Sequence, residues 1–178
     1  MPTRLGRISF AVLIAFACFV AAPARAGSTD EAAGPVSGLP VPRFVSLKAD
    51  KVNLRAGPTR DHDVTWVFTR AGLPVEIIAE SENWRRIRDS EGTEGWVYHS
   101  LLSSRRTVLV APWSKKKETF PLYQSNDRGS AVAAELQPGV LGSVKSCDGK
   151  WCRIFGDGFD GYIEQERLWG VYPNETVE

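Results

Sequence analysis

The sequence predicts an all-β fold made of two tandem copies of one small β module. Short, partly alternating segments of apolar and polar residues, such as Val75–Ile78, are separated by glycine and proline, and no window shows a helical apolar stripe. The chain also repeats itself, because Glu82–Leu102 aligns with Gly149–Leu168. Two copies of a module of roughly 60 residues therefore fill the chain after its N-terminal segments.

Residues 1–26 are predicted to be a signal peptide. Arg4 and Arg7 precede a short apolar run, and Ala24–Ala26 offers small residues at the spacing that signal peptidase recognises. The run is short for a membrane span and ends at Pro23. We expect an exported protein, periplasmic or secreted, with no stable membrane span after cleavage. The alternatives are an uncleaved anchor and a lipoprotein acylated at Cys18.

Cleavage changes both the charge and the cysteine count. Removing residues 1–26 takes away three arginines and no acid, so the net charge of +1 becomes −2. Such a chain has no general attraction to nucleic acid. Only Cys147 and Cys152 remain, and an even pair in an oxidising compartment favours a disulfide over thiol chemistry.

The remaining segments divide the chain into a linker and two domains. Residues 27–42 are rich in glycine and proline and poor in large apolar side chains, so we expect a flexible linker there. The first module is predicted to span residues 43–104 and the second residues 107–173. The join lies near Ser103–Arg106.

The repeat also assigns equivalent residues. Trp84 corresponds to Trp151, and Gly72 corresponds to Gly139. Asn53-Leu54-Arg55 falls opposite Pro121-Leu122-Tyr123, so the second copy departs from the first at this segment.

Motifs of the first module resemble the bacterial SH3-like (SH3b) domains of exported and envelope proteins: Val52–Pro58, Trp84–Ile87, Gly95–Val97 and Leu101-Leu102. The closing Leu168–Pro173 resembles the tail of short proteobacterial proteins with two such modules behind a signal peptide. This resemblance implies two small SH3-like β-barrels. It also implies peptidoglycan, or a protein or peptide of the cell envelope, as the ligand.

The resemblance further implies a set of candidate binding residues. Trp84 and Trp151 match the tryptophan of the peptide groove in eukaryotic SH3 domains. Tyr98 stands where the groove proline is expected, so a Pro-rich peptide is not the expected ligand. A Trp84 platform flanked by Tyr98 and the Arg55 loop is predicted to hold a peptide stem or a glycan by stacking and hydrogen bonding. The candidate ligand-binding residues are Trp84, Tyr98, Arg55, Asn53 and Trp151.

No residue set predicts catalysis. The two histidines, His62 and His99, lack a cysteine or a metal-ligand partner at a suitable spacing. The acidic pairs Glu91/Glu94 and Asp157/Asp160 lie in glycine-rich loops, without an apolar pocket to raise a pKa. We therefore expect no catalytic residue, no metal, no cofactor and no enzymatic activity.

Two functions remain open at this point. The first is non-enzymatic binding of peptidoglycan or an envelope partner. The second is a protein assembly adaptor in the periplasm with no glycan binding. An adaptor would use the basic run Lys115–Lys117 or a groove between the modules.

Cys147 and Cys152 are predicted to form a hairpin disulfide. If Gly149-Lys150 is a two-residue turn, the cysteines occupy a close, non-hydrogen-bonded pair within disulfide reach. Their four intervening residues do not match a thioredoxin-type site, and a zinc site needs two more ligands. The first module has Glu80 and Arg85 at these positions, where we expect a cross-strand ion pair.

Overall fold

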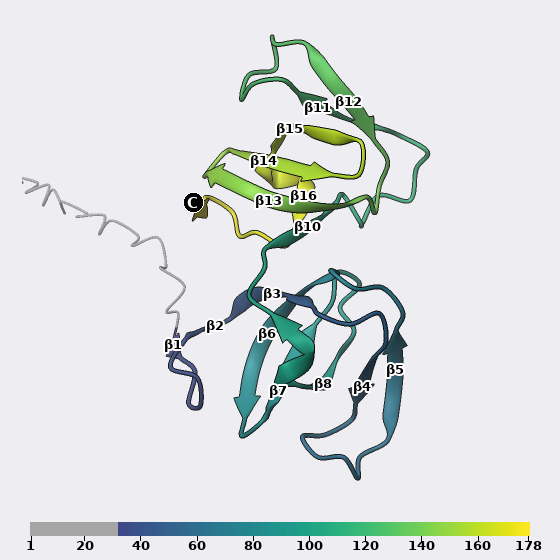
Figure 1. Cartoon of the computed structure of the whole chain (residues 1–178), viewed down its shortest axis with the longest axis vertical. Helices are drawn as coiled ribbons and strands as arrows, with labels where there is room; N and C mark the ends of the chain where they lie inside the picture. The colour runs from purple at the N-terminus through teal and green to yellow at the C-terminus, as the bar shows by residue number, and fades with distance from the viewer. Residues whose placement is uncertain (1–31) are drawn as a thin grey trace, which may run out of the picture. The chain divides into compact units, whose positions relative to one another are not determined.

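A computed structural model describes residues 32–178, which contain two β modules and no α-helix (Figure 1). The first module consists of β3 (Arg43–Leu47), β4 (Val52–Arg55), β5 (Val64–Phe68), β6 (Pro74–Ser81), β7 (Trp84–Arg88), β8 (Glu94–Tyr98), the 3₁₀ helix η1 (His99–Leu101) and β9 (Leu102–Ser103). The second consists of β10 (Thr107–Val110), β11 (Phe120–Tyr123), β12 (Val132–Leu136), β13 (Leu141–Asp148), β14 (Trp151–Gly156), β15 (Phe159–Glu164), the 3₁₀ helix η2 (Gln165–Arg167), β16 (Leu168–Trp169) and β17 (Thr176–Val177).

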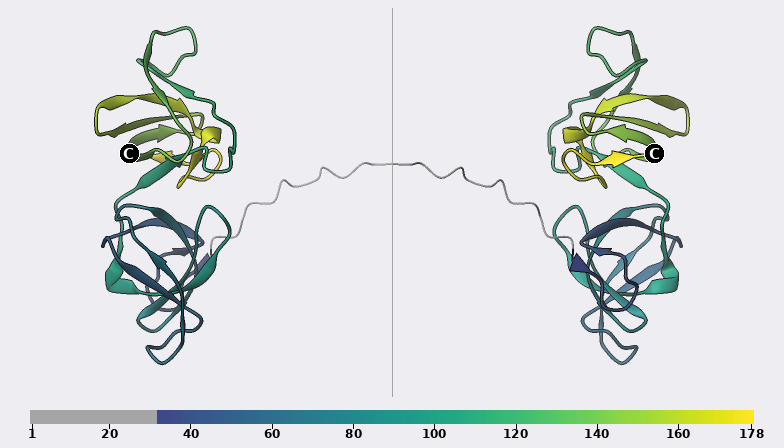
Figure 2. Two further views of the ribbon diagram at one scale, coloured as in Figure 1. Left: turned by 90° about the vertical axis from the view of Figure 1, so that its right-hand side faces the viewer. Right: turned by 90° about the vertical axis from the view of Figure 1, so that its left-hand side faces the viewer.

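Both modules have the same strand order, which confirms the predicted repeat. The first sheet runs β5-β4-β8-β7-β6-β3-β9, and the second runs β12-β11-β15-β14-β13-β10-β16, with β17 added against β13. Figure 2 shows in opposite views that the strands of each module curl around a common interior. The all-β prediction of two small SH3-like barrels is therefore correct.

Each barrel encloses its own apolar core. Alternation along β4 turns Val52 and Leu54 inward, and both side chains are fully buried. The first core consists of Val45, Leu47, Val52, Leu54, Phe68, Val75, Ile77, Ile87 and Val97. The second consists of Val108, Val110, Ala111, Phe120, Leu122, Leu136, Cys147, Cys152, Ile154, Ile163, Leu168 and Val171.

One glycine in each barrel allows two strands to approach closely. A Cβ on Gly95 of β8 would lie 2.5 Å from Cγ of Leu54, and one on Gly161 of β15 would lie 2.6 Å from the carbonyl oxygen of Tyr123. Both contacts are shorter than a side chain tolerates. Glycine at this position therefore lets β8 cross closely over β4, and β15 over β11.

The expected flexible linker is wrong for residues 32–42. These residues form β1 (Ala32–Ala33) and β2 (Pro40–Val41), joined by a turn. The turn is fixed by Glu80 of β6, whose carboxylate accepts hydrogen bonds from the N–H groups of Val36 and Ser37 and from the hydroxyl of Ser37. Burial raises the pKa of Glu80, but these bonds and one from Arg43 outweigh it and lower the pKa to about 2.

The predicted cross-strand links, a disulfide in one hairpin and an ion pair in the other, are confirmed. Cys147 and Cys152 face each other in register and form a disulfide with a Cα–Cα distance of 4.1 Å. In the first module, Glu80 pairs with Arg85 across β6 and β7, with Oε1 and Nε 3.3 Å apart. The same hairpin is thus held by charge in one copy and by a covalent bond in the other.

The two barrels belong to one compact unit and touch through aromatic and polar contacts. Thr107 Oγ1 donates to the carbonyl oxygen of Gly72 at 2.6 Å, and Tyr172 Oη donates to Glu76 Oε1 at 2.9 Å. Burial and the Glu76 carboxylate both raise the pKa of Tyr172. The predicted signal peptide, residues 1–26, and residues 27–31 of the predicted linker lie outside the described residues. Within residues 32–178, no helix has the length and apolarity that a membrane span requires.

Candidate functional site

Four of the five predicted binding residues meet in one groove on the first barrel. Asn53 and Arg55 come from β4, Trp84 begins β7, and Tyr98 ends β8. The groove has a volume of about 390 Å³, and its other lining residues are Lys51, Arg60, Ser100 and Leu101. The barrel therefore brings together residues that are up to 45 positions apart in the sequence.

The aromatic part of the groove is built by strand register. Trp84 and Tyr98 are directly opposite each other on β7 and β8, and their rings meet edge to face with centroids 5.4 Å apart. Trp84 is only 9% exposed, so most of its ring supports the groove floor. Trp84, which was predicted to be an open platform, is therefore mostly buried, and the half-buried Tyr98 is the more exposed ring of the pair.

The loop beside the groove is held by Arg55. Its Nη1 donates hydrogen bonds to the carbonyl oxygens of Arg60, at 3.0 Å, and of His62, at 2.7 Å. These bonds set the Arg60 guanidinium 6.0 Å from the centroid of the Tyr98 ring. Arg55 thus positions the loop, while Arg60 remains exposed and available to a ligand.

The groove carries a positive charge. Its lining includes Lys51, Arg55 and Arg60 and, within residues 32–178, no carboxylate. Sequence reasoning missed Lys51 and Arg60. Lys51 could have been found, because positions 51, 53 and 55 share one face of an extended strand. Arg60 reaches the groove only through the path of the loop, which has no local signal.

The corresponding groove of the second barrel is chemically different. It holds about 380 Å³ and is lined by Glu118, Thr119, Phe120, Pro121, Tyr123, Arg128, Ile163, Glu164 and Arg167. Glu164, at the position of Tyr98, forms an ion pair with Arg128 and lies 3.5 Å from Arg167. The two acids of this lining, Glu118 and Glu164, balance its two arginines, so this groove lacks the net positive charge of the first.

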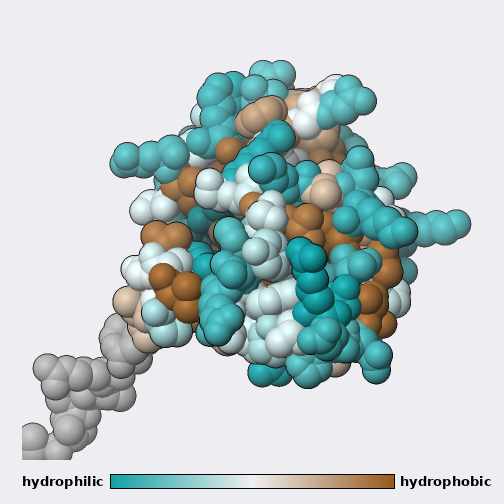
Figure 3. Space-filling view, turned by 60° about the horizontal axis from the view of Figure 1, so that its bottom comes forward, coloured by the Kyte–Doolittle hydropathy of each residue, from teal (hydrophilic) through white to brown (hydrophobic). Residues whose placement is uncertain are grey.

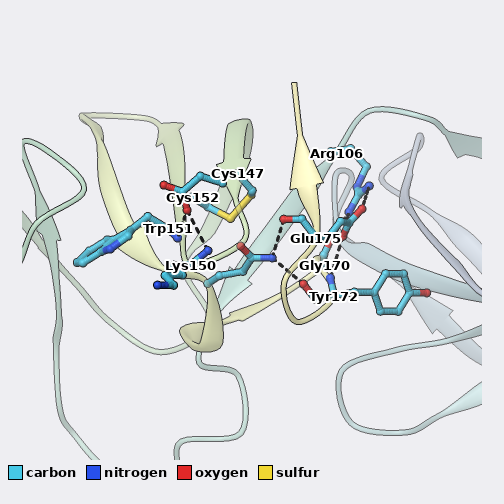
Figure 4. Close-up of a disulfide and its surroundings, with 10 residues drawn as sticks. Arg106, Cys147, Lys150, Trp151, Cys152, Gly170, Tyr172 and Glu175 are labelled. Atoms are coloured by element: carbon cyan, nitrogen blue, oxygen red, sulfur yellow. Dashed lines mark hydrogen bonds and ion pairs between the residues drawn. A yellow bond between two sulfur atoms is a disulfide. The ribbon is translucent and has the colours of Figure 1, made fainter. Parts of the chain in front are cut away.

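Trp151, the fifth predicted residue, is not part of either groove. Its ring packs edge-on against Tyr123 with centroids 5.6 Å apart, and it lines a separate cleft. Figure 4 shows Trp151 pointing away from the Cys147–Cys152 disulfide. Asp148 accepts hydrogen bonds from the N–H groups of Trp151 and Lys150, and these bonds lower its pKa.

None of the residues considered for catalysis lines the two grooves or the cleft. His62 and His99 are exposed, and Asp160 is paired with Arg153, which lowers the pKa of Asp160. Glu94 lies 2.8 Å from Arg86. Within the described part of the chain, no cluster of three or more histidine, cysteine or acidic side chains has a geometry suited to a metal ion.

On the face shown in Figure 3, hydrophobic side chains occupy small separate areas among hydrophilic ones. Lys115, Lys116 and Lys117 are all exposed. This surface has no extended apolar area of the kind that marks a stable protein interface.

The comparison with family models agrees with this architecture. A model of the family described as "Bacterial SH3 domain" matches residues 48–104 and again residues 116–170. Similar solved structures include NlpC2 and NlpC1 from Trichomonas vaginalis, each 15% identical with a TM-score of 0.32. The alignments cover 72% and 76% of this chain but 48% of each of those chains, so the chain spans about half their length. No protein with a curated description matches significantly.

Proposed function

Because the chain belongs to the bacterial SH3 domain family, we propose that it is a non-enzymatic binding protein that is exported and holds peptidoglycan through the groove of its first barrel. The observation that carries this proposal is the groove itself. It combines the Tyr98 ring, the Asn53 amide and the cationic side chains of Lys51 and Arg60.

This combination suits a peptide stem of peptidoglycan. Stem peptides carry free carboxylates, and guanidinium groups bind carboxylates with strong charge-assisted hydrogen bonds. An aromatic ring adds contact area at low entropic cost because its rotation is limited to two torsions. The predicted signal peptide, residues 1–26, would deliver this groove to the compartment that contains the ligand.

The first barrel is the proposed binding module, and the second is its support. Glu164 occupies the second groove with an ion pair to Arg128, so an anionic ligand would have to displace a carboxylate there. The same family fold therefore provides one cationic site and one neutralised site. This difference offers a matched control for the test.

The test is sedimentation with purified, insoluble peptidoglycan. Arg60→Ala and Tyr98→Ala should each reduce the bound fraction, with an apparent affinity loss of about tenfold for Arg60→Ala. Arg167→Ala, which removes an arginine that lines only the second groove, should bind like the wild type. These variants are preferable to Trp84→Ala, because the Trp84 ring is buried and its loss would disturb the barrel.

Two results would contradict the proposal. Equal sedimentation of all four proteins would show that the groove is not the binding site. No sedimentation of the wild type would exclude peptidoglycan binding and leave the periplasmic adaptor as the function to test.

A further inference from the structure

A second cavity, distinct from the groove, lies along the second barrel. This cleft has a volume of about 770 Å³, roughly twice that of the first-barrel groove, and falls within the range of small-molecule sites. It is lined by the C-terminal tail, the hairpin turn at Gly149, the loop that carries Trp113, and three residues of the first barrel. We call it the tryptophan cleft because Trp113, Trp151 and Trp169 all line it.

Each tryptophan is held by its own local structure. Trp169 Nε1 donates to the carbonyl oxygen of Pro74 at 3.2 Å, and its ring lies edge to face with Phe44 at 5.1 Å. Trp151 is fixed by Tyr123. Trp113 lies in a turn closed by the N–H of Ser114 and the carbonyl of Ala111, and it is 52% exposed. An indole this exposed has apolar surface available for a ligand.

The wall between these rings is preformed. Gln165 of η2 donates its backbone N–H to Lys150 and its side-chain Nε2 to the carbonyl oxygens of Tyr172 and Glu175, at 2.6 and 3.0 Å. Glu175 is in turn bound by Arg106, as Figure 4 shows. The hairpin turn and the tail are therefore tied to one residue, and binding would need little ordering of the cleft.

The charges of the cleft are balanced, unlike those of the groove. Its lining has three acids and three bases: Glu76, Glu164, Glu166, Arg88, Arg128 and Lys150. Glu76 lies 2.6 Å from Arg88, and Glu164 pairs with Arg128. A cleft with no net charge has no preference for a polyanion or a polycation. Its paired carboxylates and guanidinium groups remain acceptors and donors for hydroxyl and amide groups.

We propose that the tryptophan cleft binds an uncharged oligosaccharide. Sugar rings present an apolar C–H face, which suits the indole of Trp113, and a rim of hydroxyl groups, which suits the neutral ion pairs. The site is independent of the peptide groove of the first barrel. It does not rest on the proposed function, since a free saccharide has no stem peptide.

The test is a calorimetric titration of the purified protein with the soluble tetramer of N-acetylglucosamine. The wild type should give saturable binding, and Trp113→Ala should weaken it at least fivefold, in keeping with the loss of one aromatic contact. Trp66→Ala is the matched control. Trp66 is 55% exposed and lies outside the cleft, so this variant should bind like the wild type.

A third variant separates this site from the groove. Arg60→Ala should leave tetramer binding unchanged even where it reduces sedimentation with peptidoglycan. The proposal is overturned if the tetramer does not bind, if Trp113→Ala and Trp66→Ala bind alike, or if a stem peptide without sugar depends on Trp113 while the tetramer does not. Failure of sedimentation with intact tetramer binding would contradict only the proposed function of the groove.

Discussion

The hydroxyl of Ser37 donates a hydrogen bond of 2.6 Å to Oε1 of Glu80, a carboxylate that is fully buried on β6. Glu80 also receives the N–H of Ser37 at 2.9 Å and Nη2 of Arg43 at 2.9 Å. One acidic side chain thus fixes the N-terminal hairpin, the start of β3 and, through Arg85, the β6–β7 hairpin. The residue connects three segments of the first barrel.

Glu80→Gln should therefore destabilise the protein in a pH-dependent manner. The folded pKa of about 2 lies below the ordinary value of 4.5, so the stabilisation is fully present above about pH 4.5 and is lost as the pH falls toward 2. At pH 7 the free energy of unfolding should fall by about 3 kcal/mol. Urea denaturation of both proteins at pH 7, 4.5 and 3 measures it, and the difference in the free energy of unfolding should be nearly the same at pH 7 and 4.5 and clearly smaller at pH 3.

The control for this prediction is Glu91→Gln. Glu91 is exposed in a loop of the same barrel, so its substitution should change the free energy of unfolding by less than about 0.5 kcal/mol. A constant difference between wild type and Glu80→Gln over the pH range would show that the charge of Glu80 is not what holds the hairpin.

The Ser37–Glu80 bond also shows where sequence reasoning ends. Composition made residues 32–42 look like a linker, because the segment lacks the apolar side chains that order a chain by burial. Here order comes instead from backbone N–H groups that bind a carboxylate 43 residues away. Such a partner is chosen by the fold and leaves no periodic pattern.

Features that repeat or alternate were predictable from the sequence. The pairing of Trp84 with Trp151 predicted equivalent strands, and the spacing of Cys147 and Cys152 predicted their register. The groove was predicted only in part. Lys51 was predictable because it shares a strand face with Asn53. The position of Arg60 depends on the course of a loop, and the position of Trp113 in the cleft depends on a turn within the second barrel.

The disulfide should stabilise the second barrel mainly by closing a short loop. With Cys147 and Cys152 at a sequence separation of 5, the chain-entropy relation gives about 2 kcal/mol. Reduction of the wild-type protein should lower the free energy of unfolding by this amount. The reduction test avoids the cavity that a serine or alanine substitution would leave. Urea denaturation with and without reductant, checked by intact mass, measures the effect.

Reduction should also loosen the C-terminus. Val177 of β17 pairs with Cys147, so the last strand depends on the hairpin that the disulfide fixes. Carboxypeptidase should release the terminal residues faster from the reduced protein. Equal stability and equal release in the two redox states would show that strand pairing alone holds this edge.

Gly95→Ala should destabilise the first barrel by about 2 kcal/mol, because the new Cβ would lie 2.5 Å from Leu54 Cγ and 2.9 Å from the backbone oxygen of Arg55. Gly142→Ala is the matched control. Its Cβ would have its nearest neighbours at 3.5 Å, an ordinary contact, so the cost should be smaller. Thermal unfolding of both variants tests the crossing of β8 over β4, and equal melting temperatures would contradict it.

Arg55→Lys should release the loop beside the groove without unfolding the barrel. The guanidinium group of Arg55 reaches the carbonyl oxygens of both Arg60 and His62. The ammonium group of lysine sits on a shorter side chain and does not hold the same two acceptors. The free energy of unfolding should fall by about 1 kcal/mol, because these hydrogen bonds are exposed to water. Hydrogen exchange of residues 56–63 should become faster, and peptidoglycan binding should weaken although all three positive charges remain.

Arg70→Lys, at an exposed position outside the groove, should change neither measurement. Unchanged exchange in Arg55→Lys would show that the loop is held by its own backbone, and Arg55 would then act on the ligand only through its charge.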